Sequence, residues 1–333
     1  MLKEDAGKFK EPSCCGGALA LGRTTRLSNL IFQASEQRQI QKARRLGLDW
    51  SAGLAAQEQR LFALLLRSLG YSHFAEPFES LASRYSYRES MERLKKPQGR
   101  LRLLADWLGE LGLLGSETEG MHEAYRPIYR SYQASFKGEV LVQLKLKGRP
   151  SNHPLRRLTG LAHHLEGLGG ESLVKYWLRF FYQAQGLLKG PKALPNLLKA
   201  LDERFAQPPD EPLAWLASPT SSKTLKHAQR LIGPSRQRVV LINGLMPFFL
   251  SWALFSKDRA LEKTLFGLFL LMPAEGPNFK TEALERRLAC QELPLRRNLA
   301  YHQGLIQFHD ELCHHYGPTC QGCPLPGWLR ETA

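Results

Sequence analysis

The sequence predicts an all-α, multi-helical fold that ends in a small cysteine-rich metal knuckle. Apolar residues recur at three- and four-residue spacing along most of the 333 residues, which is the period of an amphipathic helix. Only residues 138–147 alternate as a strand does, and that segment is also compatible with one face of a helix. Hydrophobic residues make up 43% of the chain, enough to bury one large core or two ordinary ones. We therefore expect a globular, α-dominated protein.

The predicted helices follow one another closely along the chain. Residues 27–46 carry apolar positions on one face, and residues 55–69 repeat the period until Gly70 ends it. Further helices are predicted at residues 78–84, 100–114, 155–168, 172–183, 193–205, 258–271, 281–293 and 299–316.

Breaks rich in proline and glycine separate groups of these helices. We expect a loosely ordered N-terminal segment at residues 1–25 and a helical region at residues 26–147. A helical core region should follow at residues 148–298, and a C-terminal helix with the cysteine knuckle at residues 299–333.

Residues 239–256 contain no charged side chain, and a run of this length could by itself span a membrane. Asn243, Gly244 and Pro247 argue against a span, because they divide the run into a short β-branched piece and a second helix that starts near Pro247. We therefore predict a buried core hairpin and no membrane.

Targeting signals are not convincing either. The first thirteen residues are charged and polar, and the apolar run at residues 18–21 is too short for the core of a signal peptide. The six cysteines cluster, whereas those of a secreted disulfide framework are spread along the chain. A cytoplasmic location is the expectation.

The closing segment is the part of the sequence that implies definite chemistry. His309, Cys313, Cys320 and Cys323 lie within fifteen residues, and the last two form a Cys-x2-Cys pair that can bring two thiolates onto one ion. Structural zinc is the first expectation, with His309 or Cys290 as the fourth ligand. Two alternatives are an iron–sulfur cluster, because Cys-x6-Cys-x2-Cys resembles the start of the helix-hairpin-helix glycosylase cluster, and thiols without metal.

The charge balance indicates an acidic partner. The chain has 46 Lys and Arg residues against 31 Asp and Glu residues, which gives a formal net charge of +15. The excess is spread over several clusters, as suits a surface that reads a phosphate backbone. Nucleic acid is the predicted partner, DNA ahead of RNA. The alternative is that the basic side chains lie on helix faces exposed to water and bind no ligand.

No signature of a phosphate-binding loop, a nucleophile elbow, a zinc protease or a dinucleotide-binding turn is present. The loop at residues 149–157 concentrates polar side chains beside prolines, and its candidate nucleic-acid-binding residues are Arg149, Asn152, Arg156 and Arg157. Helix capping is the simpler interpretation of such a loop. A competing enzyme hypothesis uses Glu275 as an acid or base in a small pocket, with Asn278 and Arg149 around it.

Four sequence blocks carry a family resemblance, and they lie at residues 149–157, 241–248, 273–278 and 303–309. Together they resemble the bacterial domain-of-unknown-function 2851 family, and the likeness extends over residues 26–325. The family has no established activity. Longer relatives, as the resemblance suggests, carry an N-terminal region similar to restriction-endonuclease-like nucleases. The resemblance thus implies that this chain is the helical C-terminal portion, whose nuclease-like partner is encoded separately or lost by truncation.

The resulting expectation is a nucleic-acid-binding or interaction module of a nuclease-like family, without a catalytic core of its own. The two alternatives are the small-pocket enzyme and a purely structural scaffold. Catalysis by this chain alone is the less favoured interpretation.

Overall fold

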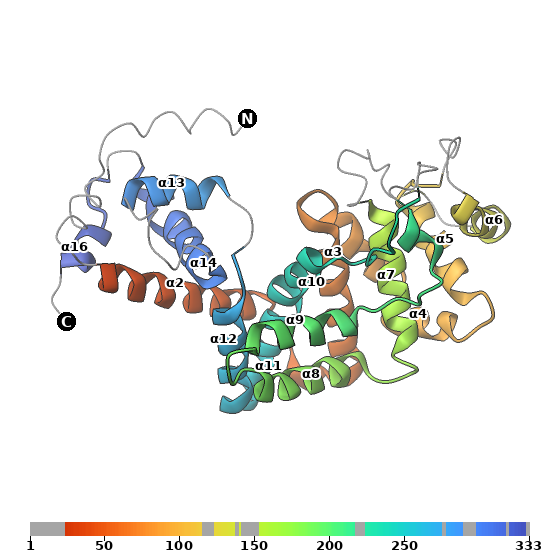
Figure 1. Ribbon diagram of the computed structural model, residues 1–333, viewed down its shortest axis with the longest axis horizontal. Helices are drawn as coiled ribbons and strands as arrows, with labels where there is room; N and C mark the ends of the chain where they lie inside the picture. Colours follow the sequence, from red (N-terminus) through yellow and green to blue (C-terminus); the bar gives the residue numbers. More distant parts are fainter. Residues whose placement is uncertain are drawn as a thin grey trace. The chain divides into compact units, whose positions relative to one another are not determined.

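The computed structural model describes residues 24–114, 123–136, 140, 153–216, 224–274, 278–288, 298–317 and 320–330. Within these ranges the chain forms α-helices with short 3₁₀ and π segments and no β-strand, which confirms the all-α prediction (Figure 1). The strand-like segment at residues 138–147 lies outside the described ranges, apart from Val140.

The chain divides into two compact units. Unit 1 contains residues 1–47 and 256–333, and unit 2 contains residues 48–255. The regions expected from sequence have other limits, since the break expected at residue 147 falls inside unit 2 and both ends of the chain share unit 1.

Unit 1 joins one N-terminal helix to the C-terminal helices. Its elements are α2 (Thr24–Arg45), α12 (Arg259–Leu271), α13 (Phe279–Leu288), α14 (Leu299–Phe308), a π segment (His309–Cys313), α15 (His314–Tyr316) and α16 (Leu325–Arg330). Helix α2 lies alongside α14 (Figure 1). Gly304 permits the approach, because a Cβ atom there would lie 2.0 Å from the carbonyl oxygen of Ile31. The two backbones therefore touch at this point.

A hydrophobic cluster holds unit 1 together. It combines side chains of α2 with side chains of α13, α14 and α16, such as Ile31, Leu284, Leu305 and Leu329. The predicted helices at residues 27–46 and 299–316 are confirmed, although the second includes a π turn.

Unit 2 contains the remaining helices. They are α3 (Leu54–Arg84), α4 (Tyr87–Leu94), α5 (Gly99–Glu110), α6 (Arg126–Ser135), α7 (Pro154–Gly167), α8 (Leu173–Leu187), α9 (Ala193–Arg204), α10 (Pro234–Val240) and α11 (Met246–Ser256). Helix α7 contacts α3, α4 and α5 and lies among them in Figure 1. Large side chains such as Trp107, Trp177 and Phe248 are completely buried in this unit.

Helix α3 folds back on itself. Gln59 donates a 2.6 Å hydrogen bond to the carbonyl of Ala82, and Arg60 and Arg67 both pair with Glu79. Such pairs can form only if the two ends of α3 run antiparallel. The helices predicted at residues 55–69 and 78–84 correspond to these two arms.

Some short helices were not predicted. Helix α4 begins at a capping box in which Ser86 and Glu89 exchange hydrogen bonds between side chain and main chain. The Ser-x-x-Glu signature is visible in the sequence. The apolar period of α4 is hard to recognise, because basic residues stand among its few apolar positions. Helices α6, α10 and α16 are too short for a clear period.

The predicted core hairpin at residues 239–256 is wrong in its shape. Helix α10 continues through a π segment (Leu241–Leu245) into α11, so the run is one helix. The π segment directly precedes Pro247 and accommodates its missing N–H, which a regular helix could not do without a kink. The helix Pro234–Ser256 is long and apolar enough to cross a membrane, but 67% of its apolar window is buried inside the protein, as in the core helix of a globular fold.

Candidate anion-binding pocket

Four arginines line one pocket of unit 2. The pocket has a volume of about 340 Å³ and lies between the first turn of α7 and the segment that leads into α10. Its described lining consists of Arg156, Arg157, Gln229, Arg230, Leu231, Gly233, Pro234, Ser235 and Arg236, with no Asp or Glu among them.

The first turn of α7 places two of these arginines. Pro154 suits the first helical position because it has no N–H to leave unpaired, and the ring nitrogen Nδ1 of His153 accepts from the amide of Leu155 at 3.2 Å. The side chains of Arg156 and Arg157 then enter the protein, where the residues are 2% and 4% exposed.

Both buried guanidinium groups bind carbonyl oxygens of distant segments. Arg156 donates to the carbonyls of Leu213 at 2.6 Å and Leu216 at 2.8 Å. Arg157 donates to the carbonyls of Leu69 at 2.8 Å and Gly70 at 3.3 Å. These bonds orient the guanidinium groups, but carbonyl oxygens are neutral and do not cancel their charge.

The electrostatics of the pocket follow from this burial. Desolvation lowers the pKa of Arg156, while Tyr125 and Glu211 nearby oppose the shift. His153 has its pKa lowered to about 4, first by burial and then by the charges of Arg157 and Arg156. The lowered pKa of Arg156 marks a poorly solvated place. The lowered pKa of His153 also reflects the positive potential of the two arginines, which an anion would relieve.

At the rim, Arg230 is held by Asp202 of α9. The two side chains form a bidentate pair with distances of 2.6 to 3.1 Å, and Gln237 donates to the same carboxylate at 2.9 Å. Burial opposes ionisation of Asp202, but the hydrogen bonds from Arg230 and Gln237 lower its pKa. This carboxylate therefore stays charged and fixes the rim arginine in place.

A buried His–Glu pair contacts the turn that binds Arg156 of the pocket. Nε2 of His163 lies 2.5 Å from Glu211, whose other oxygen accepts from the amide of Leu213 at 3.2 Å. A guanidinium nitrogen of Arg100 lies 3.2 Å from Nδ1 of His163. The pair orders the 3₁₀ turn Pro212–Trp215, which supplies a carbonyl to Arg156.

The structure brings together only part of the predicted site. Arg156 and Arg157 meet in the pocket, whereas Arg149, Asn152 and Glu275 lie outside the described residues. Sequence reasoning did not select Arg230 and Arg236, although both belong to a basic cluster at residues 223–238 that composition alone reveals. No local pattern connects that cluster with α7.

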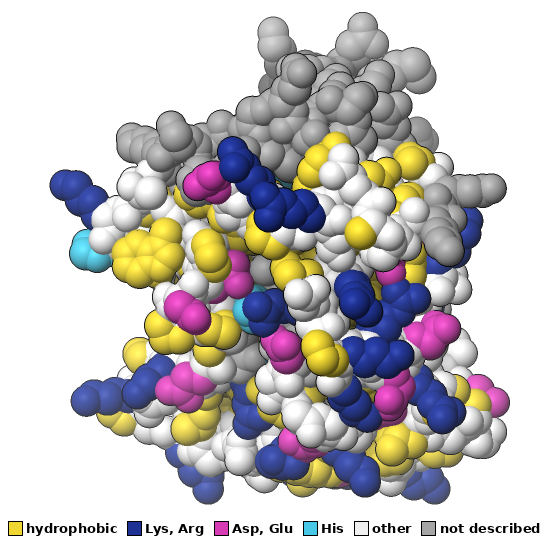
Figure 2. Space-filling model, turned by 90° about the vertical axis from the view of Figure 1, so that its right-hand side faces the viewer, with side chains coloured by type: hydrophobic (Ala, Val, Ile, Leu, Met, Phe, Trp, Pro, Cys, Tyr) yellow, Lys and Arg dark blue, Asp and Glu magenta, His cyan; other side chains and the backbone are white. Residues whose placement is uncertain are grey.

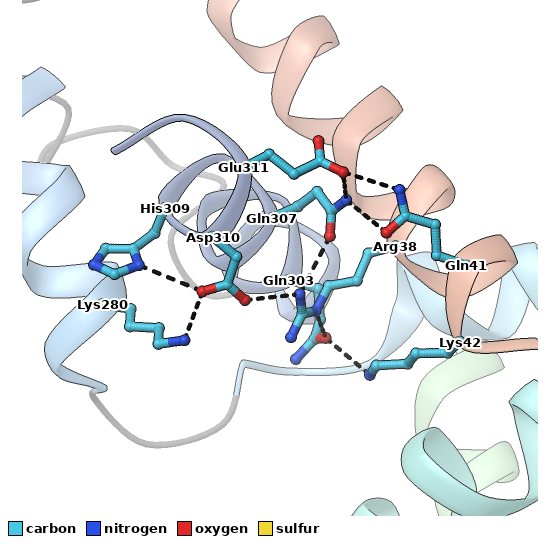
Figure 3. A network of polar contacts seen from close by, with 9 residues as sticks. All are labelled: Arg38, Gln41, Lys42, Lys280, Gln303, Gln307, His309, Asp310 and Glu311. Atoms are coloured by element: carbon cyan, nitrogen blue, oxygen red, sulfur yellow. Dashed lines mark hydrogen bonds and ion pairs between the residues drawn. The ribbon is translucent and has the colours of Figure 1, made fainter. Parts of the chain in front are cut away.

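A second polar assembly lies in unit 1 and joins α2 to the C-terminal helices (Figure 3). Arg38 donates to Gln303, Gln307 and Asp310 at 3.1 to 3.2 Å. Lys280 of α13 donates to the other oxygen of Asp310 at 2.5 Å. Figure 3 shows these side chains pointing toward one another, so their charges serve contacts within the unit.

The predicted metal knuckle is not assembled in the described residues. They contain no group of three His, Cys, Asp or Glu side chains placed to bind a metal ion, and Cys313, Cys320 and Cys323 form no disulfide bond there. His309 instead faces Asp310 at 3.4 Å. The alternative ligand Cys290 lies outside the described ranges. One reason for the difference is that residues 309–313 form a π turn, so His309 and Cys313 do not share the α-helical face expected for them.

Basic side chains are distributed over the surface as well. On the face drawn in Figure 2, Lys and Arg side chains stand among Asp, Glu and hydrophobic side chains and form no single continuous patch. The pocket, by contrast, brings four arginines together.

The sequence matches the model of one protein family, described as "Protein of unknown function (DUF2851)", over residues 6–278. The chain matches no curated protein and no solved structure. The match covers the arginines of the pocket, whereas the block at residues 303–309 and the last three cysteines lie beyond it. Since the match begins at residue 6, it does not support the expectation that a nuclease-like N-terminal region is missing. A separately encoded partner stays a prediction.

Proposed function

On the premise that the chain belongs to the DUF2851 family of proteins of unknown function, we propose that it binds nucleic acid through the phosphate backbone, with the arginine pocket as the main contact. The observation that carries the proposal is the convergence of four arginines on one pocket whose described lining has no acidic residue. Arginine binds phosphate well because its planar guanidinium group can donate two parallel hydrogen bonds.

The rest of the molecule agrees with a polyanionic ligand. The formal net charge of +15 attracts nucleic acid at long range, and the spread of basic side chains allows contacts to further phosphates. DNA is proposed ahead of RNA, because the resemblance suggests that longer relatives carry a region similar to restriction-endonuclease-like nucleases. The proposal assigns no catalytic step to this chain.

The experiment compares arginine variants by fluorescence anisotropy with a labelled oligonucleotide. Arg236→Gln and Arg230→Gln should each weaken binding by about tenfold, since each removes a charge-assisted contact to phosphate. The matched control is Arg179→Gln on α8, where the side chain is 56% exposed and pairs with Glu171. The control removes the same charge and should change affinity by about twofold or less. Equal effects of pocket and control variants would contradict the proposal.

We propose separately that the C-terminal cysteines bind a structural zinc ion, with Cys313, Cys320 and Cys323 as ligands and His309 or Cys290 as the fourth. The spacing in sequence supports it. Cys313 and Cys323 also pack against the same hydrophobic cluster of unit 1, and Cys320 has a left-handed backbone (φ 55°) that tightens the turn between them.

Metal analysis tests the zinc proposal. The purified protein should be colourless and contain about one equivalent of zinc, and Cys320→Ser should lose it. His309→Ala and Cys290→Ser then identify the fourth ligand, because only the true ligand should weaken retention. A brown protein would indicate an iron–sulfur cluster in place of zinc. Protein that is free of metal after preparation without chelators would refute both.

A further inference from the structure

Helix α6 carries a row of three aromatic rings on one side. Tyr129, Tyr132 and Phe136, the residue that follows the helix, are spaced so that they share a face. The rings of Tyr129 and Tyr132 lie 6.3 Å apart at 26°, and those of Tyr132 and Phe136 lie 4.8 Å apart at 30°. The three rings therefore form a stacked row along one side of the helix.

This row differs from the aromatic clusters of the core. Trp177, Phe180 and Phe181 of α8 are at most 1% exposed and meet edge to face, at 71° to 80°. The rings on α6 are only partly buried and nearly parallel. A partly exposed row leaves ring surface within reach of a flat partner, which a buried cluster cannot do.

Helix α5 packs against two of the three rings and fixes their position. A Cβ atom at Gly109 would lie 2.7 Å from a ring carbon of Tyr132 and 2.8 Å from one of Phe136. Only glycine therefore lets both rings rest against α5 as they do. Two of the three rings are consequently held in place before any ligand arrives, which lowers the entropic cost of stacking a partner on them.

Basic side chains and the arginine pocket adjoin the row. Arg126 and Arg130 are exposed on α6, and Arg126 pairs with the exposed carboxylate of Glu123 at 2.9 Å. Tyr125, directly before α6, is 1% exposed and interacts electrostatically with Arg156 of the pocket. The row therefore starts close to where the proposed function puts a phosphate.

We propose that this row, named here the α6 ring row (Tyr129, Tyr132 and Phe136), stacks unpaired bases, so that the ligand of the protein is single-stranded nucleic acid. The inference rests on the proposed function and deepens it. Aromatic rings beside positive charge are how proteins bind single strands without sequence preference, because every base has a flat face and every linkage a phosphate. A duplex hides those faces between base pairs, so it can use the arginines but not the ring row.

The test measures the affinity of ring variants for two ligands, an oligothymidylate of about 15 nucleotides and a duplex of the same length. Tyr129→Leu and Phe136→Leu keep an apolar side chain but remove the ring. Each should weaken binding of the single strand by about fivefold or more and leave duplex binding within about twofold. Tyr129→Phe keeps the ring and should bind as the wild type does.

The matched control is Tyr182→Leu. Tyr182 is 44% exposed on α8 and lies beside Lys175 and Arg179, so it is an exposed aromatic residue with basic neighbours outside the row. Its loss should leave single-strand affinity unchanged. Circular dichroism verifies folding, and Tyr129→Leu is decisive if Phe136→Leu does not fold, because ring atoms of Phe136, and not of Tyr129, are among the three nearest to a Cβ atom at Gly109.

The outcomes separate this inference from the proposed function. Leucine variants that bind both ligands as the wild type does, or that weaken both equally, overturn the inference, while an effect of Arg230→Gln and Arg236→Gln still supports the pocket. A wild-type dimer that the leucine variants abolish, with single-strand affinity unchanged, assigns the row to a second copy and also overturns it. A wild-type protein that binds neither ligand at low salt overturns the proposed function, and the inference with it.

Discussion

Arg156 and Arg157 are neighbours in the sequence, yet their guanidinium groups bind the main chain of different segments. The local pattern of prolines and arginines predicted polar contacts, and it also allowed a simple capping role. The side chain that caps α7 is that of His153, while the two arginines fasten α7 to neighbouring segments and also line a pocket. Burying a guanidinium group costs free energy, which Glu211 offsets in part for Arg156, and this cost is the physical reason to expect an anion there.

At the same scale, His164 predicts how stability depends on pH. Its Nδ1 lies 2.8 Å from the carbonyl of Arg204 and must carry the proton, while Nε2 is buried without a hydrogen-bond partner among the described residues. Burial lowers the pKa of His164 from 6.5 to about 4. Between these values the unfolded chain binds a proton that the folded protein does not. Stability should therefore be lost as the pH falls from 6.5 to 4, by roughly 3 kcal/mol for this residue.

Urea denaturation at pH 7 and at pH 4.5 measures the effect. His164→Gln has no titrating ring, so its free energy of unfolding should fall less than that of the wild type over this interval. Parallel losses in the two proteins would show that His164 does not carry the pH dependence.

At the scale of elements, helices were predicted where the apolar period is long. The two arms of α3 and the helices α2, α7, α8 and α12 agree with the sequence pattern to within a few residues. The continuous helix Pro234–Ser256 was predicted as a hairpin, since Asn243, Gly244 and Pro247 read as a break. A π turn resolves that conflict, and its formation depends on packing around it.

The contact between α2 and α14 gives a prediction at this scale. In Gly304→Ala the added methyl group would overlap the carbonyl of Ile31, so the helices must separate and the free energy of unfolding should fall by about 2 to 3 kcal/mol. Amide hydrogen exchange in α2 and α14 should accelerate accordingly. The control in the same unit is Gly327→Ala on α16, where no atom lies within 4 Å of the new Cβ. It should be neutral or slightly stabilising, because alanine favours a helix. An equally mild effect at Gly304 would mean that the two backbones are not in contact.

For the whole molecule, the charge balance has a measurable consequence. A protein with a formal net charge of +15 that neutralises several phosphates should release counterions on binding. Its affinity for nucleic acid should therefore fall on the order of tenfold or more between about 50 and 200 mM salt. A gel-shift or anisotropy titration over this range provides the slope. Affinity that is independent of salt would exclude a phosphate-backbone contact of this size.

The sequence by itself determined that the chain is helical, where most of the long helices lie and that its charge suits a polyanion. These properties are local or additive, because an apolar period and a count of charges do not depend on distant partners. It could also single out Arg156 and Arg157, since adjacent arginines after a proline are visible in one short segment.

Only the tertiary structure decided which elements meet. Arg230 and Arg236 join Arg156 and Arg157 across more than seventy positions of the sequence, and α2 joins helices from the other end of the chain. The position of the stacked rings on α6 likewise depends on α5, where Gly109 leaves space for two of them. Such partnerships follow from the shapes of surfaces that local patterns do not encode, and this is why the helices could be predicted while the pocket and the ring row could not.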